Sequence, residues 1–509
     1  MTAVLRLTLC FALGFLLLHG PAVRAEDPPA KPAEADHPPD RKSAAGGLLA
    51  LLPADSVTQH TIEAAGRKLA YAATAGALPV RDDKGEETAR VFYTAYTLTG
   101  AKPADRSLTF VFNGGPGAGS AYLQLGLAGP YRLDFGGAND GAHAKLVENA
   151  DTWLDFTDLV FIDPVGTGYS VAAKPDAAAK QFWGVRQDAD YLADLVGLYL
   201  IRNSRTASPK YLLAESYGGL RAAKVARVLQ QEHGVVLSGI TMVSPLIEAN
   251  MLFGIRGNPL LAALRLPSFA AAELVRKGTF APDKLAAIEQ FARTEYLSTI
   301  VGKPPTGEAG AQFYGKVADL IGLPEPLVAQ YRGMVPIDAM SKHFRAGDDD
   351  IVSLYDATLA TPDPFPDSEQ SHHDDPVLDG FTRSFANGFA GYARDQLGFK
   401  TDLEYRLLAE DVNQKWDWHS AGRDLPGGME DLRQLLALDP SLKLMVVHGY
   451  TDLLTAYGIN KYLLDHLPDL GDRTRVQLKL YPGGHMLYLA PDSRRALTQD
   501  AKALYPAPQ

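Results

Sequence analysis

Cysteine is nearly absent from this sequence of 509 residues. The single copy, Cys10, stands in an apolar run close to the N-terminus. If that run is removed on maturation, the remaining chain has no thiol and forms no disulfide bond. A fold that depends on disulfide bonds is therefore excluded.

Charge is sparse, and no basic patch is visible. Only 21% of the residues are charged, and the net charge is −11. Phosphate binding relies on clusters of Lys and Arg, so the sequence argues against nucleic acid as a partner. Because 46% of the residues are hydrophobic, the chain can bury a large core and can hold one large domain plus an insertion.

Long hydrophobic runs are missing beyond the N-terminus. The run over 7–18 follows Arg6 and is short for a bilayer span, and residues 22–25 end in the small side chains that a signal peptidase reads. We predict a signal peptide over residues 1–25 and no permanent membrane span after its cleavage. The mature protein would be periplasmic or secreted, and its lack of cysteine fits a bacterial envelope.

Composition and pattern divide the rest of the chain. Residues 26–46 are rich in Pro, Ala and mixed charge, which predicts a disordered linker. Strand-like and helix-like stretches predict a core over 47–247 that resumes over 438–509. Between these two parts, helical stretches alternate with Pro-rich and acidic loops. We interpret this interval, 248–437, as an inserted, mainly helical cap.

The two core parts predict an α/β fold with a mostly parallel sheet. Short apolar runs at 108–112, 158–163 and 239–244 are typical of buried parallel strands. Earlier runs at 68–72 and 90–96 indicate antiparallel strands. Since strands alternate with stretches of helical spacing, such as 182–202, we expect a sheet flanked by helices.

Ser216 stands at a predicted strand-to-helix turn. A strand-like run over 210–213 precedes it, a helix-forming stretch over 220–231 follows, and small residues flank the serine. This arrangement is typical of a nucleophile elbow, the sharp turn that lifts a serine hydroxyl clear of the backbone. The competing interpretation is an ordinary turn with a capping serine.

A serine nucleophile needs a base and a carboxylate that orients this base. In hydrolases built on an open α/β sheet, Asp and then His follow the serine, each after a strand. The strand-like run 442–447 opens into a turn with Asp452, and the run 476–481 ends in a glycine-rich loop with His485. We therefore predict a catalytic triad of Ser216, Asp452 and His485.

Other histidines compete for the role of base. His448 is nearest, but it precedes the carboxylate and stands where its strand ends, so we interpret it as a residue behind the site. The run His-His-Asp-Asp at 372–375 suggests a metal site, yet it lies among prolines and acidic residues without a helix or strand to hold it. We interpret this run as a solvated acidic loop, and we predict no metal and no organic cofactor.

Acyl transfer also needs hydrogen-bond donors for the oxyanion. The run 108–112 leads into a glycine-rich loop, where the backbone can approach a ligand closely. We assign the oxyanion hole to the backbone N–H groups of Gly115 and Tyr217. A phosphate-binding loop is the alternative, but no Gly-Lys-Ser/Thr follows, and the Gly-x-Gly at 166–168 lacks the third glycine of a dinucleotide site.

Several sequence blocks occur together. They are Asn-Gly-Gly-Pro-Gly at 113–117, Asp-Pro-Val-Gly-Thr-Gly-Tyr-Ser at 163–170 and Glu-Ser-Tyr-Gly-Gly at 215–219, followed by the turn at Asp452 and by Gly-His at 484–485. In this combination the chain resembles the serine carboxypeptidases of peptidase family S10. The resemblance implies an α/β-hydrolase fold, hydrolysis of the C-terminal bond of peptides or proteins, and the same triad.

The resemblance also implies that Asn113 and Glu215 bind the free carboxylate of the substrate. Two carboxylates in contact cannot both stay ionised, so they must share a proton. We therefore expect a protonated Glu215 that acts as a donor, and activity on free-carboxylate peptides that is best on the acid side of neutral. The alternative is a glutamate that only braces the turn.

The chain departs from the S10 pattern beside this carboxylate site. Val111 stands where the relatives carry a tryptophan, Leu127 where they carry an acidic residue, and Ala118 where a cysteine is common. A serine esterase or acyltransferase on the same scaffold therefore stays open as an alternative, as does a non-catalytic binding protein.

Overall fold

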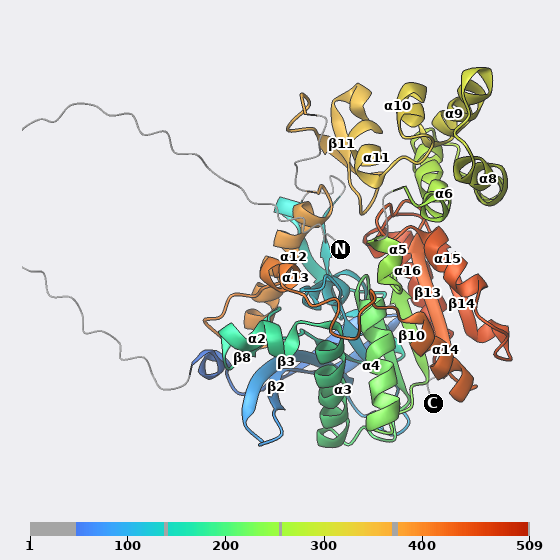
Figure 1. Cartoon of the computed structure of the whole chain (residues 1–509). Coiled ribbons are helices and arrows are strands. Elements are labelled where there is room, and N and C mark those ends of the chain that lie inside the picture. Colours follow the sequence, from blue (N-terminus) through green and yellow to red (C-terminus); the bar gives the residue numbers. More distant parts are fainter. Residues whose placement is uncertain (1–46, 137–140, 254–256, 369–374, 507–509) are drawn as a thin grey trace, which may run out of the picture. The chain divides into compact units, whose positions relative to one another are not determined.

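A ten-stranded sheet forms the centre of the fold (Figure 1). The computed structural model describes residues 47–136, 141–253, 257–368 and 375–506, so the predicted signal peptide and linker lie outside the described residues. The strand order is β1-β2-β3-β7-β4-β9-β10-β13-β14, with β8 paired to β3. The strands are β1 (Ser56–Ala64), β2 (Arg67–Arg81), β3 (Glu87–Leu98), β4 (Leu108–Phe112), β7 (Asp158–Ile162), β8 (Val171–Ala172), β9 (Lys210–Glu215), β10 (Gly239–Val243), β13 (Lys443–Gly449) and β14 (Val476–Tyr481).

Hydrophobic side chains cover both faces of the parallel part of the sheet. All pairs from β7 to β14 are parallel, and β4, β7 and β10 are buried at every residue. Successive residues of a strand point to opposite faces, so Phe110 and Phe112 pack in one cluster and Val111 in another. The unbroken apolar runs of the sequence follow from this double burial. The predicted α/β class with a mostly parallel sheet is confirmed.

Helices flank the sheet on each side. The cluster that holds Phe110 includes residues of α3, α4 and α14, whereas the cluster with Val111 includes residues of α1, α12 and α16. A short hairpin, β5 (Tyr131–Asp134) and β6 (Lys145–Glu148), lies outside the main sheet. The helices of these layers are α1 (Ala121–Leu123), α2 (Pro175–Phe182), α3 (Val185–Arg202), α4 (Gly218–Glu232), α12 (Leu378–Asp395), α14 (Met429–Leu438), α15 (Tyr457–Asp465) and α16 (Pro491–Lys502).

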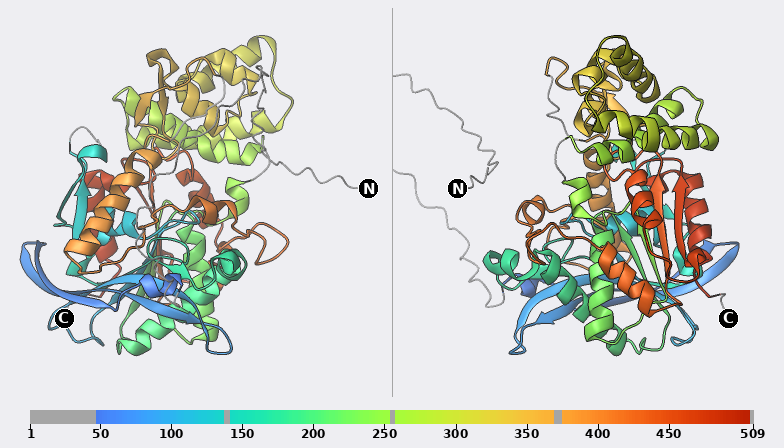
Figure 2. Two further views of the ribbon diagram at one scale, coloured as in Figure 1. Left: turned by 90° about the vertical axis from the view of Figure 1, so that its left-hand side faces the viewer. Right: turned by 45° about the vertical axis from the view of Figure 1, so that its right-hand side comes forward.

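Between β10 and β13 the chain forms mainly helices. Helices α6 to α11 share a hydrophobic cluster that includes Phe269, Phe313 and Val317. Figure 2 shows these yellow-green helices gathered on one side, away from the blue strands β1 to β3. The elements are α5 (Ala249–Leu252), α6 (Pro259–Arg276), α7 (Pro282–Phe291), α8 (Leu297–Val301), α9 (Gly307–Ile321), α10 (Glu325–Gln330), α11 (Ile337–His343), the hairpin β11 (Asp350–Val352) and β12 (Ala360–Pro362), and α13 (Glu410–Gln414).

The interval 248–437 packs in two different ways. Helix α12 inserts Phe381, Phe385 and Phe389 into the cluster that also covers the sheet, and it does not belong to the cluster of α6 to α11. The boundaries predicted for the core and the cap stay a prediction. Within the described residues, no helix is both long enough and apolar enough to cross a membrane.

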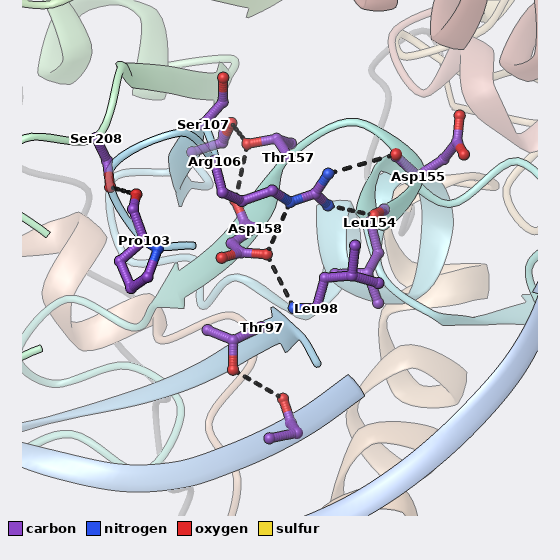
Figure 3. Close-up of polar contacts among 12 residues, drawn as sticks. Thr97, Leu98, Pro103, Arg106, Ser107, Leu154, Asp155, Thr157, Asp158 and Ser208 are labelled. Atoms are coloured by element: carbon purple, nitrogen blue, oxygen red, sulfur yellow. Dashed lines mark hydrogen bonds and ion pairs between the residues drawn. The ribbon is translucent and has the colours of Figure 1, made fainter. Parts of the chain in front are cut away.

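The two ends of the parallel strands differ in chemistry. At the amino end of β7, Asp158 accepts hydrogen bonds from Arg106 Nε at 3.1 Å, from Arg205 at 2.6 Å and from the Leu98 N–H at 3.0 Å. Figure 3 shows Asp158 between Arg106 and Leu98. The loops that carry the predicted site residues follow the carboxyl ends of β4, β9, β13 and β14, which meet at the opposite edge of the sheet.

Candidate active site

Ser216 stands at a sharp turn between β9 and α4. Its φ of 60° is unfavourable for a residue with a side chain. The turn is held because the Ser216 N–H donates to the Val243 carbonyl at 3.0 Å and the Ser216 carbonyl accepts from the Gly219 N–H at 2.9 Å. A Cβ at position 219 would lie 2.4 Å from Cβ of Pro245, so this neighbour must be glycine. The turn leaves Ser216 partly exposed between buried neighbours.

His485 and Asp452 form a buried pair. His485 Nδ1 lies 2.8 Å from Asp452 Oδ2, and the two residues are 2% and 0% exposed. Thr455 donates its hydroxyl to Oδ2 at 2.7 Å, and its N–H donates to Oδ1 at 3.0 Å. Because the pair uses Nδ1, the Nε2 atom of His485 is left for another partner.

Ser216 and His485 line one cavity of about 330 Å³. Among the described residues, no hydrogen bond joins the Ser216 hydroxyl to the imidazole. Hydrogen bonds of this kind often tighten only when substrate binds. The structure thus brings the three predicted triad residues to one site, with the His–Asp contact formed and without a Ser–His hydrogen bond.

Two backbone N–H groups near Ser216 have no hydrogen-bond partner among the described residues. Neither the Gly115 N–H nor the Tyr217 N–H donates a hydrogen bond to any described residue, and both residues line the cavity. Gly114 lies against the elbow, since a Cβ there would be 2.6 Å from the Tyr217 nitrogen. Gly115 has a φ of 97°, which glycine alone adopts without strain. The predicted oxyanion donors are therefore available for a ligand.

Asn113 and Glu215 touch each other in the same cavity. Asn113 Nδ2 donates to Glu215 Oε2 at 2.5 Å, and Asn113 Oδ1 accepts from the Leu123 N–H at 3.2 Å. The Tyr488 hydroxyl lies 2.9 and 3.0 Å from the two Glu215 oxygens. Glu215 is 2% exposed. The predicted pair is thus joined by a third residue that sequence reasoning missed.

The two carboxyl groups of the site have opposite electrostatics. Burial raises the pKa of Glu215 to about 7, against the opposing effects of His485 and of the hydrogen-bond donors. Burial also raises the pKa of Asp452, but the adjacent His485 outweighs burial and holds that pKa below its usual value. Burial lowers the pKa of His485, whereas Asp452 and then Glu215 bring it above its usual value. Asp452 therefore stays ionised, and Glu215 can gain a proton near neutral pH.

His448 lies behind the site, in contact with Asn460. Its Nε2 is 2.8 Å from Asn460 Nδ2, and burial lowers its pKa to about 4, so the ring is neutral. The predicted acidic loop at 372–375 lies outside the described residues except for Asp375, which accepts from the Val377 and Leu378 N–H groups at the start of α12. In the described part of the chain, no group of three or more His, Cys, Asp or Glu residues is arranged to hold a metal.

Three residues of the site were not predicted from the sequence. Thr455 bonds the Asp452 carboxylate, Tyr488 bonds Glu215, and the Tyr355 ring stands edge-on to His485 with centroids 5.2 Å apart. Tyr488 and Thr455 each follow a predicted residue by three positions, and a helical turn at those points would have placed them nearby. Tyr355 belongs to a distant loop and carries no such signal.

Part of the chain is similar in sequence to a known protein family. Residues 67–289, less than half of the chain, match the family model of the serine carboxypeptidases, Peptidase_S10. The chain is 35% identical over 108 residues to pheromone-processing carboxypeptidase KEX1 of Saccharomyces cerevisiae, covering 20% of this chain and 14% of that protein. It is 32% identical over 149 residues to retinoid-inducible serine carboxypeptidase of Rattus norvegicus. That match covers 28% of this chain and 30% of the rat protein. The matches span less than a third of either relative.

A solved structure extends the similarity to most of the chain. The prohormone-processing carboxypeptidase KEX1(DELTA)P from Saccharomyces cerevisiae matches with a TM-score of 0.53 and 17% identity, over 85% of this chain and 91% of that one. At this identity the likeness shows the fold, which is the predicted α/β-hydrolase fold. Taken together, the sequence matches show that part of the chain is similar to the serine carboxypeptidases of peptidase family S10, and the structure match shows the fold.

Proposed function

We propose that the chain is a serine carboxypeptidase with Ser216, His485 and Asp452 as its triad. The observation that supports this most is one cavity with a partly exposed serine on an elbow, a histidine paired to a buried aspartate, and two unpartnered N–H groups. Each of these features follows the carboxyl end of a parallel strand, which is where α/β-hydrolase sites form.

The proposed reaction is acyl transfer to Ser216. His485 Nε2 takes the Ser216 proton as Oγ attacks the scissile carbonyl carbon, and Asp452 holds the imidazole through Nδ1–H. The N–H groups of Gly115 and Tyr217 stabilise the oxyanion. His485 then gives its proton to the leaving amine, and a water activated by the same imidazole releases the acyl group.

Glu215 and Asn113 would bind the substrate carboxylate. No Lys or Arg lies among the described residues that line the cavity, so this anion must rely on neutral donors. Asn113 Nδ2 is one such donor. A protonated Glu215 is another, and its pKa of about 7 places that proton within reach at neutral and acid pH. Recognition of a free carboxylate is what separates a carboxypeptidase from the esterase and acyltransferase alternatives.

Acid pH should favour this activity. Below about pH 7, Glu215 is protonated and can donate to the substrate, whereas above it the two anions repel. His485 must be neutral to act as base, so the rate rises as pH passes its pKa. Protonation of Glu215 removes a negative neighbour that raises the pKa of His485, so the same proton favours both binding and the base.

Labelling and digestion test the proposal together. We expect a fluorophosphonate probe to label Ser216 and the enzyme to release single residues from the C-termini of a peptide library. Ser216→Ala should abolish both while leaving the fold intact. Labelling without C-terminal release, combined with rapid ester cleavage, would favour the esterase. Substantial hydrolysis by Ser216→Ala would place the nucleophile elsewhere.

The cellular location is a second part of the proposal. We propose that the mature protein is exported to the periplasm or the medium, because residues 1–25 have the pattern of a signal peptide. A mature N-terminus near residue 26 in the exported fraction would support this location.

A further inference from the structure

Tyr488 is a buried tyrosine behind the cavity that contacts the cavity residue Glu215, and the proposed mechanism does not use it. Its hydroxyl lies 2.9 Å from Glu215 Oε1 and 3.0 Å from Oε2. We propose that Tyr488 is a positioning residue of the carboxylate subsite, and that its hydroxyl holds Glu215 ready to take up the proton it shares with a substrate carboxylate. This inference rests on the function proposed for Glu215.

The contact is well placed for such a role. Tyr488 is 0% exposed and Glu215 is 2% exposed, so water does not compete for their hydrogen bond. A tyrosine hydroxyl has one proton, and its nearly equal distances allow it to donate to either Glu215 oxygen. Asn113 donates to Oε2 only. When Glu215 gains a proton on one oxygen, the Tyr488 hydroxyl can therefore turn to the other.

Gly126 fixes the position of the Tyr488 ring. Tyr488 lies on a short helical turn, Leu487–Leu489, and its ring packs across the backbone at Gly126. A Cβ at residue 126 would lie 2.4 Å from Cε2 of Tyr488 and 3.0 Å from Cδ2. The space that lets the ring reach Glu215 thus depends on glycine at this position. The neighbouring Leu127 is the place where the resemblance to the S10 family led us to expect an acidic residue.

The groups that face Glu215 determine whether loss of the Tyr488 hydroxyl raises or lowers the pKa of Glu215. They are His485 and Asp452, which follow β14 and β13, the tyrosines Tyr122 and Tyr355, and Tyr488 itself. Burial first, and then the charge of Glu215, keep the pKa of Tyr488 well above its usual value. Its hydroxyl therefore stays a donor and stabilises the ionised form of Glu215. Loss of the hydroxyl should raise the pKa of Glu215.

The test compares Tyr488→Phe with wild type by two measurements. The first is kcat/KM against pH for a peptide with a free carboxylate, whose alkaline limb should move up by about one pH unit in the variant. The second is the rate of fluorophosphonate labelling of Ser216 against pH. Its acid limb should move to lower pH, because a neutral Glu215 no longer raises the pKa of His485. The second readout needs no peptide substrate.

Two further variants sharpen the result. Gly126→Ala keeps the hydroxyl but displaces the ring, so it should shift both limbs in the same directions. Tyr457→Phe is the matched control, because Tyr457 is also buried and donates to a glutamate, Glu289, at 2.9 Å, but Glu289, unlike Glu215, does not line the cavity. Its profiles should equal those of wild type. Thermal unfolding checks that each variant is folded.

The outcomes separate this inference from the proposed function. If Tyr488→Phe leaves the labelling profile and the free-carboxylate profile unchanged, Tyr488 has no positioning role. If wild type labels at Ser216 but shows no preference for a free carboxylate, the carboxypeptidase assignment fails. In that case the labelling profile alone decides about Tyr488, and superimposable profiles overturn its role.

Discussion

At the scale of single residues, two carboxyl groups of one site have different environments and hence different charges. Asp452 is held ionised by the adjacent His485, whereas burial dominates at Glu215 and raises its pKa to about 7. Environments that push two pKa values apart divide the roles between such groups. Asp452 fits the fixed negative charge that orients a base, and Glu215 fits the group that exchanges a proton.

Glu215→Gln tests this division of roles. The amide has nearly the same shape and donates at every pH, but it does not titrate. We therefore expect kcat/KM for a free-carboxylate peptide to lose its fall above about pH 7, so that the ratio of activity at alkaline to acid pH rises. The measurement is a pH profile with the amidated peptide as control. An alkaline fall that persists in Glu215→Gln must come from another group.

The residues of the proposed triad could be named from the sequence because each follows a strand. Ser216, Asp452 and His485 are fixed by the ends of β9, β13 and β14, and such ends are visible as apolar runs. Tyr488 was not predictable in its role, since its partner Glu215 is 273 positions away and nothing local records that contact. A working triad also needs a Ser–His hydrogen bond, which the structure does not form among the described residues.

At the scale of elements, strands that are buried on both faces were the easiest to predict from the sequence. Strands β4, β7 and β10 have apolar side chains on both faces, so they were evident as unbroken runs. Helix α12 was harder to interpret, because an apolar stripe does not say which surface it covers. Its phenylalanines Phe381, Phe385 and Phe389 return to the cluster over the sheet, although the helix lies within the interval assigned to the cap.

The buried ion pairs of Asp158 at the amino end of β7 should contribute strongly to the stability of the fold. Figure 3 shows Asp158 beside Arg106. Asp158→Asn would leave both Arg106 and Arg205 buried without their anion. Loss of one partner from a buried ion pair costs about 3–5 kcal/mol, so we expect a clear fall in the free energy of unfolding. Because this network lies at the opposite edge of the sheet from the site, labelling of Ser216 in the folded variant should be retained.

An exposed ion pair provides a matched control for the buried pairs of Asp158, because the same Asp→Asn change is made at the surface. Asp492→Asn breaks the pair with Arg495, in which the aspartate side chain is 98% exposed. Exposed pairs contribute about 0–1 kcal/mol, so this variant should unfold almost like wild type. Denaturant unfolding of both variants provides the measurement. Equal losses in the two variants would mean that the Asp158 network contributes no more than a surface pair.

At the scale of the whole molecule, buried acids link the fold to pH. Burial raises the pKa of Glu215 from 4.5 to about 7 and that of Asp163 from 3.8 to about 6. Both groups hold their protons more tightly in the folded chain than in the unfolded chain. Their contribution to stability is therefore complete below pH 4 and is lost as pH rises through about 6 to 7. The raised pKa of His485 acts in the same direction.

The free energy of unfolding should consequently be higher near pH 5 than near pH 7.5. One pH unit over which only the folded state holds the proton corresponds to about 1.4 kcal/mol. Above pH 5, Glu215 therefore loses about 3 kcal/mol before its pKa of about 7 is passed, and Asp163 about 1 kcal/mol before its pKa of about 6 is passed. Glu215→Gln and Asp163→Asn should each reduce it, and the double variant should reduce it further. Thermal unfolding at the two pH values measures the effect. Stability that increases toward pH 7.5 would contradict it, because other groups would then dominate the pH dependence of the fold.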